Sequence, residues 1–119
     1  MKKFNKLVLY DLKSKPLDKN FVVQLKKFAK SVKVVLADKE YSGKLNSLHL
    51  KNADALIVRI FDFYPDSLFE KSSLKYIGSM HTDVSHFNST ALNKKKIILT
   101  NVPGYSTEAV AELTISALL

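Results

Sequence analysis

The chain has 119 residues, of which 46% are hydrophobic and 25% charged, a composition typical of one globular domain that excludes disordered and fibrous proteins. The sequence has no cysteine, which excludes disulfides and thiolate metal sites and agrees with a reducing compartment, and no apolar run approaches the length of a membrane span. The formal net charge is +8, but nearly all of the positive charge is lysine spread along the chain, with Arg59 as the single arginine. Because specific readers of nucleic-acid bases rely on arginine, we expect no nucleic-acid partner. The lack of cysteine and of a membrane-length apolar run leads us to expect a cytoplasmic protein with no membrane partner.

The first half of the chain alternates strand-like runs with amphipathic segments. A short apolar run that ends at an aspartate predicts a buried strand at 6–10. Apolar residues then recur at helical spacing over 21–32, which predicts a helix with one apolar stripe. A second strand is predicted at 34–37, a short helix at 44–50 and a third strand at 55–58.

The second half continues this alternation. A proline marks the start of a helix at 66–72, because its fixed φ suits the first helical turn. A fourth strand is predicted at 76–78, a helix at 84–93 and a fifth strand at 97–100. The last helix, at 107–119, is apolar over much of its circumference, as helices buried on several sides are.

These strands are apolar throughout and are separated by helices, which predicts an α/β fold with a parallel sheet covered on both faces. Ligands of such sheets collect where the carboxyl ends of the strands meet the following loops. Two of these loops are rich in polar groups. Residues 79–83 combine a hydroxyl, an imidazole and a carboxylate just before a helix N-terminus, which favours anions. Residues 101–106 form a turn before the last helix, which Ser106 or Thr107 can cap.

These residues carry a resemblance to a known family. The stretch 53–119 resembles the N-terminal portion of the NAD-dependent D-isomer-specific 2-hydroxyacid dehydrogenases. Residues 101–113, NVPGYSTEAVAEL, are similar almost position for position to the family's segment leading into its hinge helix. Residues 77–88 give weaker support, and residues 1–52 agree only in the order of strands and helices. The resemblance implies a flavodoxin-like parallel five-stranded sheet with helices on both faces, ending in an apolar hinge helix.

The resemblance also implies site residues. In the family, the loop matching His81, Thr82 and Asp83 presents backbone amides to the substrate's carboxylate. The position matching Thr82 lies against the nicotinamide of the NAD cofactor, and the position matching Ser106 lies near the substrate. The implied substrate-binding residues are therefore His81, Thr82, Asp83 and Ser106, with Thr82 as the cofactor contact and a small 2-hydroxy or 2-oxo acid as the ligand.

The chain also departs from the family. The resemblance makes 1–106 the substrate-side domain and 107–119 the start of the hinge helix, which leads in the family to a dinucleotide-binding domain. The chain contains three glycines, Gly43, Gly78 and Gly104. These glycines are too far apart to form the G-x-G-x-x-G turn that binds a pyrophosphate. The family's catalytic arginine, acid and histidine also match no position up to Leu119. We assign no catalytic residue and expect this chain alone to be inactive.

Two features of the first loop have competing interpretations. Asp83 stands where the family usually has glycine, and a carboxylate beside an anion cradle would repel an anionic substrate. His81, Asp83 and His86 include metal-ligand types, but such residues often only form hydrogen bonds in a loop, so we assign no metal.

Features near the end of the third strand also have alternative interpretations. Arg59 either holds a substrate carboxylate or pairs with Asp11 or Asp62. The aromatic residues within 61–64 are expected to pack in the core or an interface rather than against a nucleobase.

The function that we expect is hydride transfer between a 2-hydroxy acid and NAD in a complete dehydrogenase, to which this chain contributes the substrate side. The alternative is a stand-alone, non-catalytic binding or interaction module derived from that domain, which Asp83 favours. Left uncovered, the apolar helix at 107–119 would expose a patch of the kind that marks interfaces. We therefore expect a homo-oligomer, such as a dimer, formed through this helix or through a sheet edge.

Overall fold

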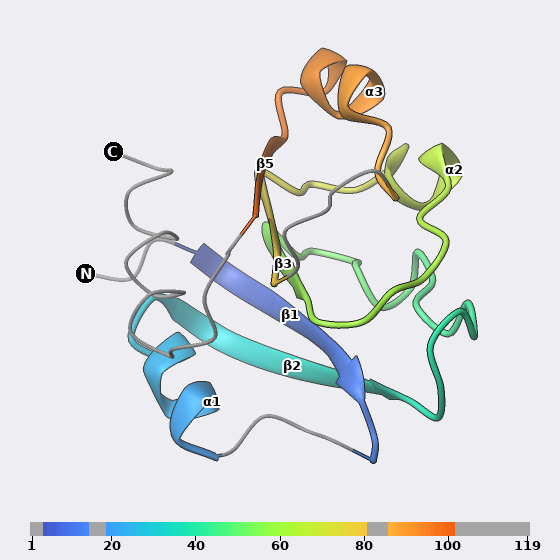
Figure 1. Ribbon diagram of the computed structural model, residues 1–119. Helices are drawn as coiled ribbons and strands as arrows, with labels where there is room; N and C mark the ends of the chain where they lie inside the picture. Colours follow the sequence, from blue (N-terminus) through green and yellow to red (C-terminus); the bar gives the residue numbers. More distant parts are fainter. Residues whose placement is uncertain (1–3, 15–18, 81–85, 102–119) are drawn as a thin grey trace.

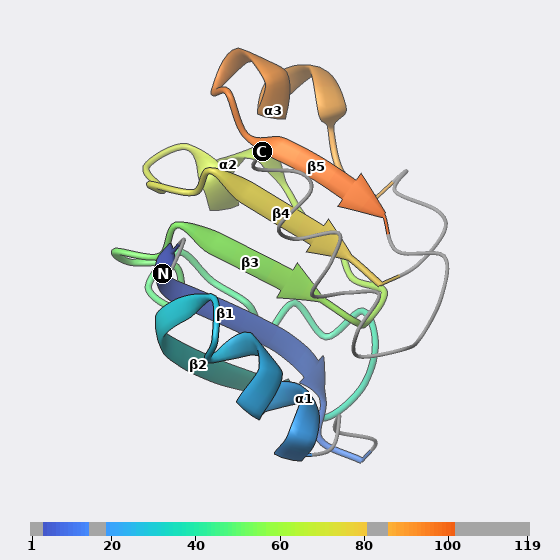
Figure 2. The same cartoon turned by 90° about the vertical axis from the view of Figure 1, so that its left-hand side faces the viewer.

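The fold is built on one parallel sheet in a computed structural model that describes residues 4–14, 19–80 and 86–101. The sheet has the order β2-β1-β3-β4-β5, which can be followed across Figure 2. Its strands are β1 (Phe4–Leu12), β2 (Ala29–Ala37), β3 (Ala55–Val58), β4 (Tyr76–Ser79) and β5 (Ile98–Asn101). All four pairings are parallel. The expected five-stranded, flavodoxin-like sheet is therefore confirmed.

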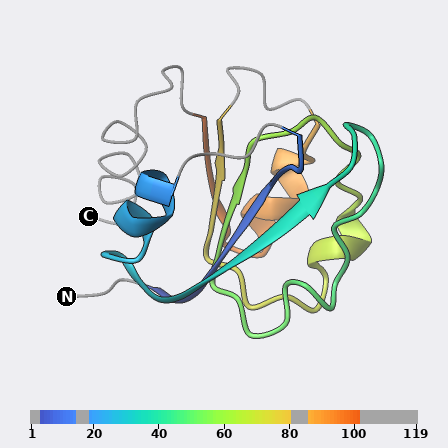
Figure 3. The same cartoon turned by 90° about the horizontal axis from the view of Figure 1, so that it is seen from below.

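Helices cover both faces of this sheet, as expected (Figures 1 and 3). Helix α1 (Lys19–Leu25) lies on one face, and α2 (Asp66–Phe69) and α3 (Ser89–Lys94) lie on the other. Each face has its own apolar cluster, because side chains of β1 alternate between them: Leu7 and Leu9 join the α1 side, and Val8 and Tyr10 join the α2 and α3 side. All residues of β3 and β4 are buried, as central parallel strands require.

The first predicted helix is too long. Helix α1 ends at Leu25, and β2 begins at Ala29, so 29–32 is strand rather than helix. The cause is tertiary pairing: Ala29 lies opposite Phe4, and Val32 lies opposite Leu7. Ala29 and Val32 still pack with the apolar residues of α1. The predicted apolar stripe is therefore confirmed, but its last residues belong to a strand and not to the helix.

The predicted helix at 44–50 is also wrong, because this segment is irregular chain that leads into turns over 47–52. The side chain of Asn46 explains the difference. Its Oδ1 accepts hydrogen bonds from the backbone N–H groups of Leu48 at 2.9 Å and His49 at 3.2 Å. An asparagine that binds the backbone two residues on favours a turn over a helix.

The helix predicted at 84–93 begins later, at Ser89, and extends to Lys94. Its N-cap is Asn88, whose Oδ1 accepts the backbone N–H of Ala91 at 3.2 Å. Asparagine is among the preferred N-cap residues, so the helix starts where this cap is available.

The remaining helices have different outcomes. Helix α2 starts at the expected residue, Asp66, but is shorter than the predicted 66–72: Ser72 donates its hydroxyl to the carbonyl of Phe69 at 2.9 Å and closes the turn there. The apolar hinge helix expected at 107–119 lies outside the described residues. Among the helices that are described, none has the length and hydropathy needed to cross a membrane.

Candidate functional site

The carboxyl edge of the sheet is the part of the fold where a ligand is expected. The chain runs from β1 to β2 on one side and then returns to β3 on the other side of β1. The strand order therefore reverses between β1 and β3, and open α/β sheets bind ligands in the crevice outside such a switch point. The loops after these two strands carry most of the polar and aromatic groups described below.

Arg59 and Asp11 form an ion pair at this switch point. Nη1 of Arg59 lies 3.3 Å from Oδ2 of Asp11. The side chain of Asp11 is 2% exposed and that of Arg59 28% exposed. The backbone N–H of Arg59 also donates to the carbonyl of Tyr10 at 2.9 Å, which extends the β1–β3 pairing to this residue. Of the two partners that the sequence left open for Arg59, the structure selects Asp11.

Asp62, the other candidate partner, is buried and binds two neighbouring loops together. Its Oδ2 accepts the hydroxyl of Tyr10 at 2.6 Å. The backbone N–H of Gly43 donates to both carboxylate oxygens at 3.1 Å, and that of Phe63 donates to Oδ1 at 2.8 Å. The Asp62 carboxylate therefore fixes the loop after β2 to the loop after β3 from inside the protein.

Two buried tyrosines accompany this carboxylate. Burial first, and then the hydrogen bond to Asp62, raise the pKa of the Tyr10 phenol above its usual value. Burial first, and then the nearby charge of Asp62, also raise the pKa of Tyr64. Tyr64 donates its hydroxyl to the carbonyl of Ile60 at 2.8 Å. Both phenols therefore remain neutral donors well above neutral pH.

These raised pKa values predict a loss of stability in alkali. The unfolded phenol of Tyr10 ionises near pH 10 while the folded one keeps its proton, so the free energy of unfolding is unaffected by Tyr10 below that pH. It should fall above pH 10, by at most about 1.4 kcal/mol per pH unit for each such tyrosine. Urea denaturation between about pH 9 and 12 would measure the slope for the wild type and for Tyr10→Phe. In Tyr10→Phe the contribution of Tyr10 to the decrease of the free energy of unfolding with pH should disappear. Equal slopes in the two proteins would contradict this interpretation.

A group of four rings, two of them exposed and two half-buried, lies beside the buried carboxylate. We call Tyr41, Phe61, Phe63 and His86 the aromatic face. The ring of Tyr41 lies 6.5 Å from that of Phe61, 5.2 Å from that of Phe63 and 6.2 Å from that of His86. The rings of Phe61 and His86 are 5.1 Å apart. Sequence reasoning missed Tyr41, because nothing in the periodicity of the chain brings this residue to the loop after β3.

The aromatic run at 61–64 is divided between surface and core. Tyr64 is buried and stacks on Phe87, with ring centroids 4.5 Å apart. Phe63, by contrast, is 71% exposed. Of the two expected environments, core or interface, Tyr64 has the core, whereas an interface stays a prediction for Phe63.

The residues implied by the family resemblance, His81, Thr82, Asp83 and Ser106, lie outside the described residues. In sequence they follow the carboxyl ends of β4 and β5, the same edge of the sheet that holds Arg59. In the described ranges no three histidine, aspartate or glutamate side chains are grouped as a metal site would need.

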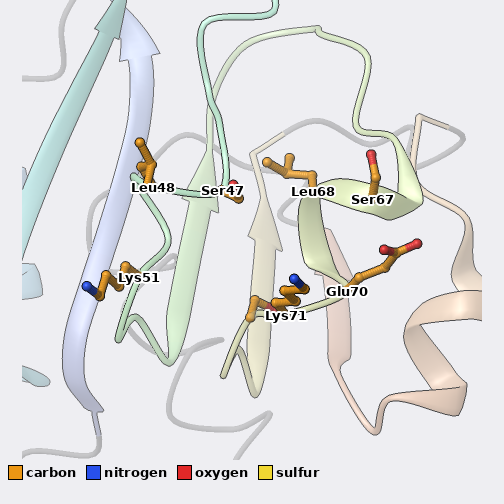
Figure 4. Close-up of a pocket in the computed structure, with 8 residues that line it drawn as sticks. Ser47, Leu48, Lys51, Ser67, Leu68, Glu70 and Lys71 are labelled. Carbon is orange, nitrogen blue, oxygen red and sulfur yellow. The ribbon is translucent and has the colours of Figure 1, made fainter.

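A separate pocket of about 530 Å³ lies between the turns at 47–52 and α2 (Figure 4). Its lining consists of three serines, two lysines, two leucines and one glutamate: Ser47, Ser67, Ser72, Lys51, Lys71, Leu48, Leu68 and Glu70. The pocket lies beside α2 rather than at the carboxyl edge, and we assign no role in catalysis to it.

The described glycines do not fit a dinucleotide. Gly43 follows β2 rather than β1, and its backbone N–H is already bound to Asp62. Gly78 lies within β4, where the ring of Tyr76 covers it. A pyrophosphate cradle needs glycines in the turn between the first strand and its helix, and neither residue lies there.

Comparison with known proteins gives relatives that include erythronate-4-phosphate dehydrogenases. Erythronate-4-phosphate dehydrogenase of Acinetobacter baylyi is 37% identical over 78 residues, which cover 65% of this chain and 22% of the relative. The enzyme of the same name from Wigglesworthia glossinidia brevipalpis is 31% identical over 103 residues, covering 87% of this chain and 26% of the relative. The chain therefore spans about a quarter or less of the length of these curated relatives.

Solved structures agree in fold. A cofactor-bound 3-phosphoglycerate dehydrogenase from Entamoeba histolytica superimposes with a TM-score of 0.66 and 26% identity, covering 94% of this chain and 37% of that one. D-lactate dehydrogenase from Escherichia coli gives a TM-score of 0.60 at 22% identity, covering 93% of this chain and 35% of that one, a likeness of fold alone. The sequence profile of the D-isomer specific 2-hydroxyacid dehydrogenase catalytic domain matches residues 8–117. The chain therefore belongs to the D-isomer specific 2-hydroxyacid dehydrogenase family, and the matched residues are those of its catalytic domain.

Proposed function

We propose that this chain is the substrate-side portion of an NAD-dependent D-2-hydroxyacid dehydrogenase. The observation that carries the proposal is the match of the catalytic-domain profile to residues 8–117. The sheet order, which leaves a switch point between β1 and β3, supports it. In the complete enzyme, hydride would pass between C2 of a 2-hydroxy acid and the nicotinamide, which carries the redox chemistry.

The role of this chain is to bind and orient the acid. Backbone amides of 81–83 would hold the substrate's carboxylate, and Ser106 would lie near the substrate. Thr82 would contact the nicotinamide end of the cofactor. We divide the chain into a substrate-side domain at 1–106 and the start of a hinge helix at 107–119. Because the three glycines of the sequence are too far apart for a G-x-G-x-x-G turn, the dinucleotide would be held by the family's separate cofactor domain in the complete enzyme.

The test compares this chain with a longer gene product that includes it. The purified 119-residue chain should not oxidise NADH with any 2-oxo acid, and saturable turnover by it would contradict the proposal. A longer product with a glycine-rich strand-turn-helix beyond Leu119 should turn over. In that product Thr82→Val should lower kcat/KM about tenfold, the value of one lost hydrogen bond of about 1.4 kcal/mol. Thr90→Val, an exposed threonine of α3, is the matched control and should leave kcat/KM unchanged.

The alternative function is a stand-alone binding module, and Asp83 is the observation that favours it. A carboxylate at this position would oppose an anionic substrate. A reading frame that stops at Leu119, together with a chain that binds no 2-oxo acid, would favour the module over the enzyme.

Self-association is part of the same proposal. The helix at 107–119 or a sheet edge would supply the contact. Of the described edges, β2 carries exposed Lys30 and Lys33, and such charges oppose edge-to-edge pairing. Strand β5 exposes Ile98 at 42% and is the better edge for a second copy.

A further inference from the structure

The segment after β3 presents one charged and two aromatic side chains on its outer side. Burial alternates along 59–64: the even-numbered residues are buried, and the odd-numbered residues are partly or fully exposed. Alternation with a period of two is the pattern of extended chain with one face inward. Arg59, Phe61 and Phe63 therefore share the outer side.

The aromatic face is formed by three segments that are distant in sequence. Tyr41 comes from the loop after β2, Phe61 and Phe63 from the loop after β3, and His86 from the chain between β4 and α3. Oη of Tyr41 lies 3.5 Å from Nε2 of His86. Tyr41 remains 48% exposed and Phe63 71% exposed. Large aromatic side chains left this open, next to the ligand edge of an α/β sheet, mark a binding surface.

The loops that carry these rings are held in place. Tyr41 has a φ of 57°, in the left-handed region that non-glycine residues rarely adopt. Its backbone N–H donates to the carbonyl of Phe61 at 2.9 Å. Buried Asp62 fixes the same two loops through Gly43 and Phe63. Strained backbone that is maintained by its surroundings is often found at ligand sites, because it positions groups before the ligand arrives.

The charge next to the aromatic face indicates the kind of ligand side chain. Arg59 is the cation on the outer side of this segment, and the buried carboxylate of Asp11 opposes its charge at 3.3 Å. A phosphate carries nearly two negative charges and needs cationic donors in excess. Exposed rings instead favour stacking with another ring or contact with bulky apolar groups.

We infer that the aromatic face receives the side chain of the 2-hydroxy acid, and that this side chain is aromatic rather than phosphorylated. The inference rests on the proposed function, since that function brings a 2-hydroxy acid to this edge of the sheet. It separates this chain from the curated relatives, whose names specify erythronate-4-phosphate. Tyr41, Phe61 and Phe63 then determine specificity and take no part in the chemistry.

The experiment titrates the 119-residue chain with four acids, followed by NMR shifts of the aromatic ring protons. The acids are D-phenyllactate, D-lactate, 3-phenylpropionate and erythronate-4-phosphate. D-phenyllactate should bind at least tenfold more tightly than D-lactate and more tightly than erythronate-4-phosphate. Phe63→Ala should weaken D-phenyllactate binding severalfold while leaving D-lactate unchanged. Val23→Ala, which truncates an exposed apolar residue of α1, is the matched control and should change neither.

Each outcome bears on one proposal. Equal binding of D-phenyllactate and D-lactate, or tighter binding of erythronate-4-phosphate, would overturn the aromatic specificity while leaving the proposed enzyme in place. Equal binding of D-phenyllactate and 3-phenylpropionate would keep the aromatic face as a ring-binding surface but contradict recognition of a 2-hydroxy acid. An unchanged D-phenyllactate affinity in Phe63→Ala would mean that the phenyl ring of the ligand does not bind at the aromatic face, and it would overturn the inference.

Discussion

Asp62→Ala should lower the free energy of unfolding by about 3 kcal/mol, because it removes the acceptor of one buried donor and two partly buried donors. Tyr10 is fully buried, and its hydroxyl donates to Asp62 at 2.6 Å. The backbone N–H groups of Gly43 and Phe63 donate to the same carboxylate. A buried donor that loses its acceptor costs about 1–3 kcal/mol, since it recovers no water. Urea denaturation near neutral pH would measure the change.

Two control variants separate this effect from a general loss of charge. Asp62→Asn keeps an acceptor oxygen for Tyr10 and should cost less than half as much as Asp62→Ala. Asp38→Ala removes an exposed carboxylate just after β2 and should stay within about 0.5 kcal/mol of the wild type. If Asp62→Ala were no less stable than Asp38→Ala, the two loops would not depend on the buried carboxylate.

The strands could be predicted from the sequence because central parallel strands are apolar throughout. Strands β3 and β4 are buried at every residue, and both were located within one residue. Strand β2 was not, because it lies at the sheet edge with exposed residues among its buried ones. At residues 29–32 the same apolar spacing fits a helix or a strand, and only pairing with β1 decides between them.

The site could be predicted only as far as local sequence determines it. The ends of β1 and β3 follow from the strand positions, and with them the proximity of Arg59 to Asp11. The position of Tyr41 against Phe61 could not be predicted, because it depends on a left-handed residue in a loop. The hydrogen bond from Gly43 to Asp62 could not be predicted either, because it joins residues 19 positions apart through loop geometry. Long-range loop contacts of this kind have no periodic signal in the sequence.

Gly78→Ala should lower the free energy of unfolding by about 2 kcal/mol, although alanine suits a strand better than glycine. Gly78 lies in central strand β4, and a Cβ built on it would lie 2.8 Å from Oη of Tyr76 and 3.2 Å from its ring carbons. Tyr76 cannot move away freely, since it is 1% exposed and its hydroxyl lies 2.7 Å from Oγ1 of Thr100 on β5. The added methyl group must therefore displace a buried ring or separate β4 from β5. Urea denaturation of the two proteins would give the difference.

A double-mutant cycle identifies the contact responsible. Tyr76→Phe removes the hydroxyl that would lie closest to the new Cβ, so Gly78→Ala should cost at least 0.5 kcal/mol less in that background than in the wild type. Gly43→Ala provides the matched comparison. No atom lies within 4 Å of a Cβ at Gly43, and its cost arises from a φ of 67° instead. The free-energy changes of Gly43→Ala and Tyr76→Phe should therefore be additive. If those of Gly78→Ala and Tyr76→Phe were also additive, Tyr76 would not be the reason that β4 needs a glycine.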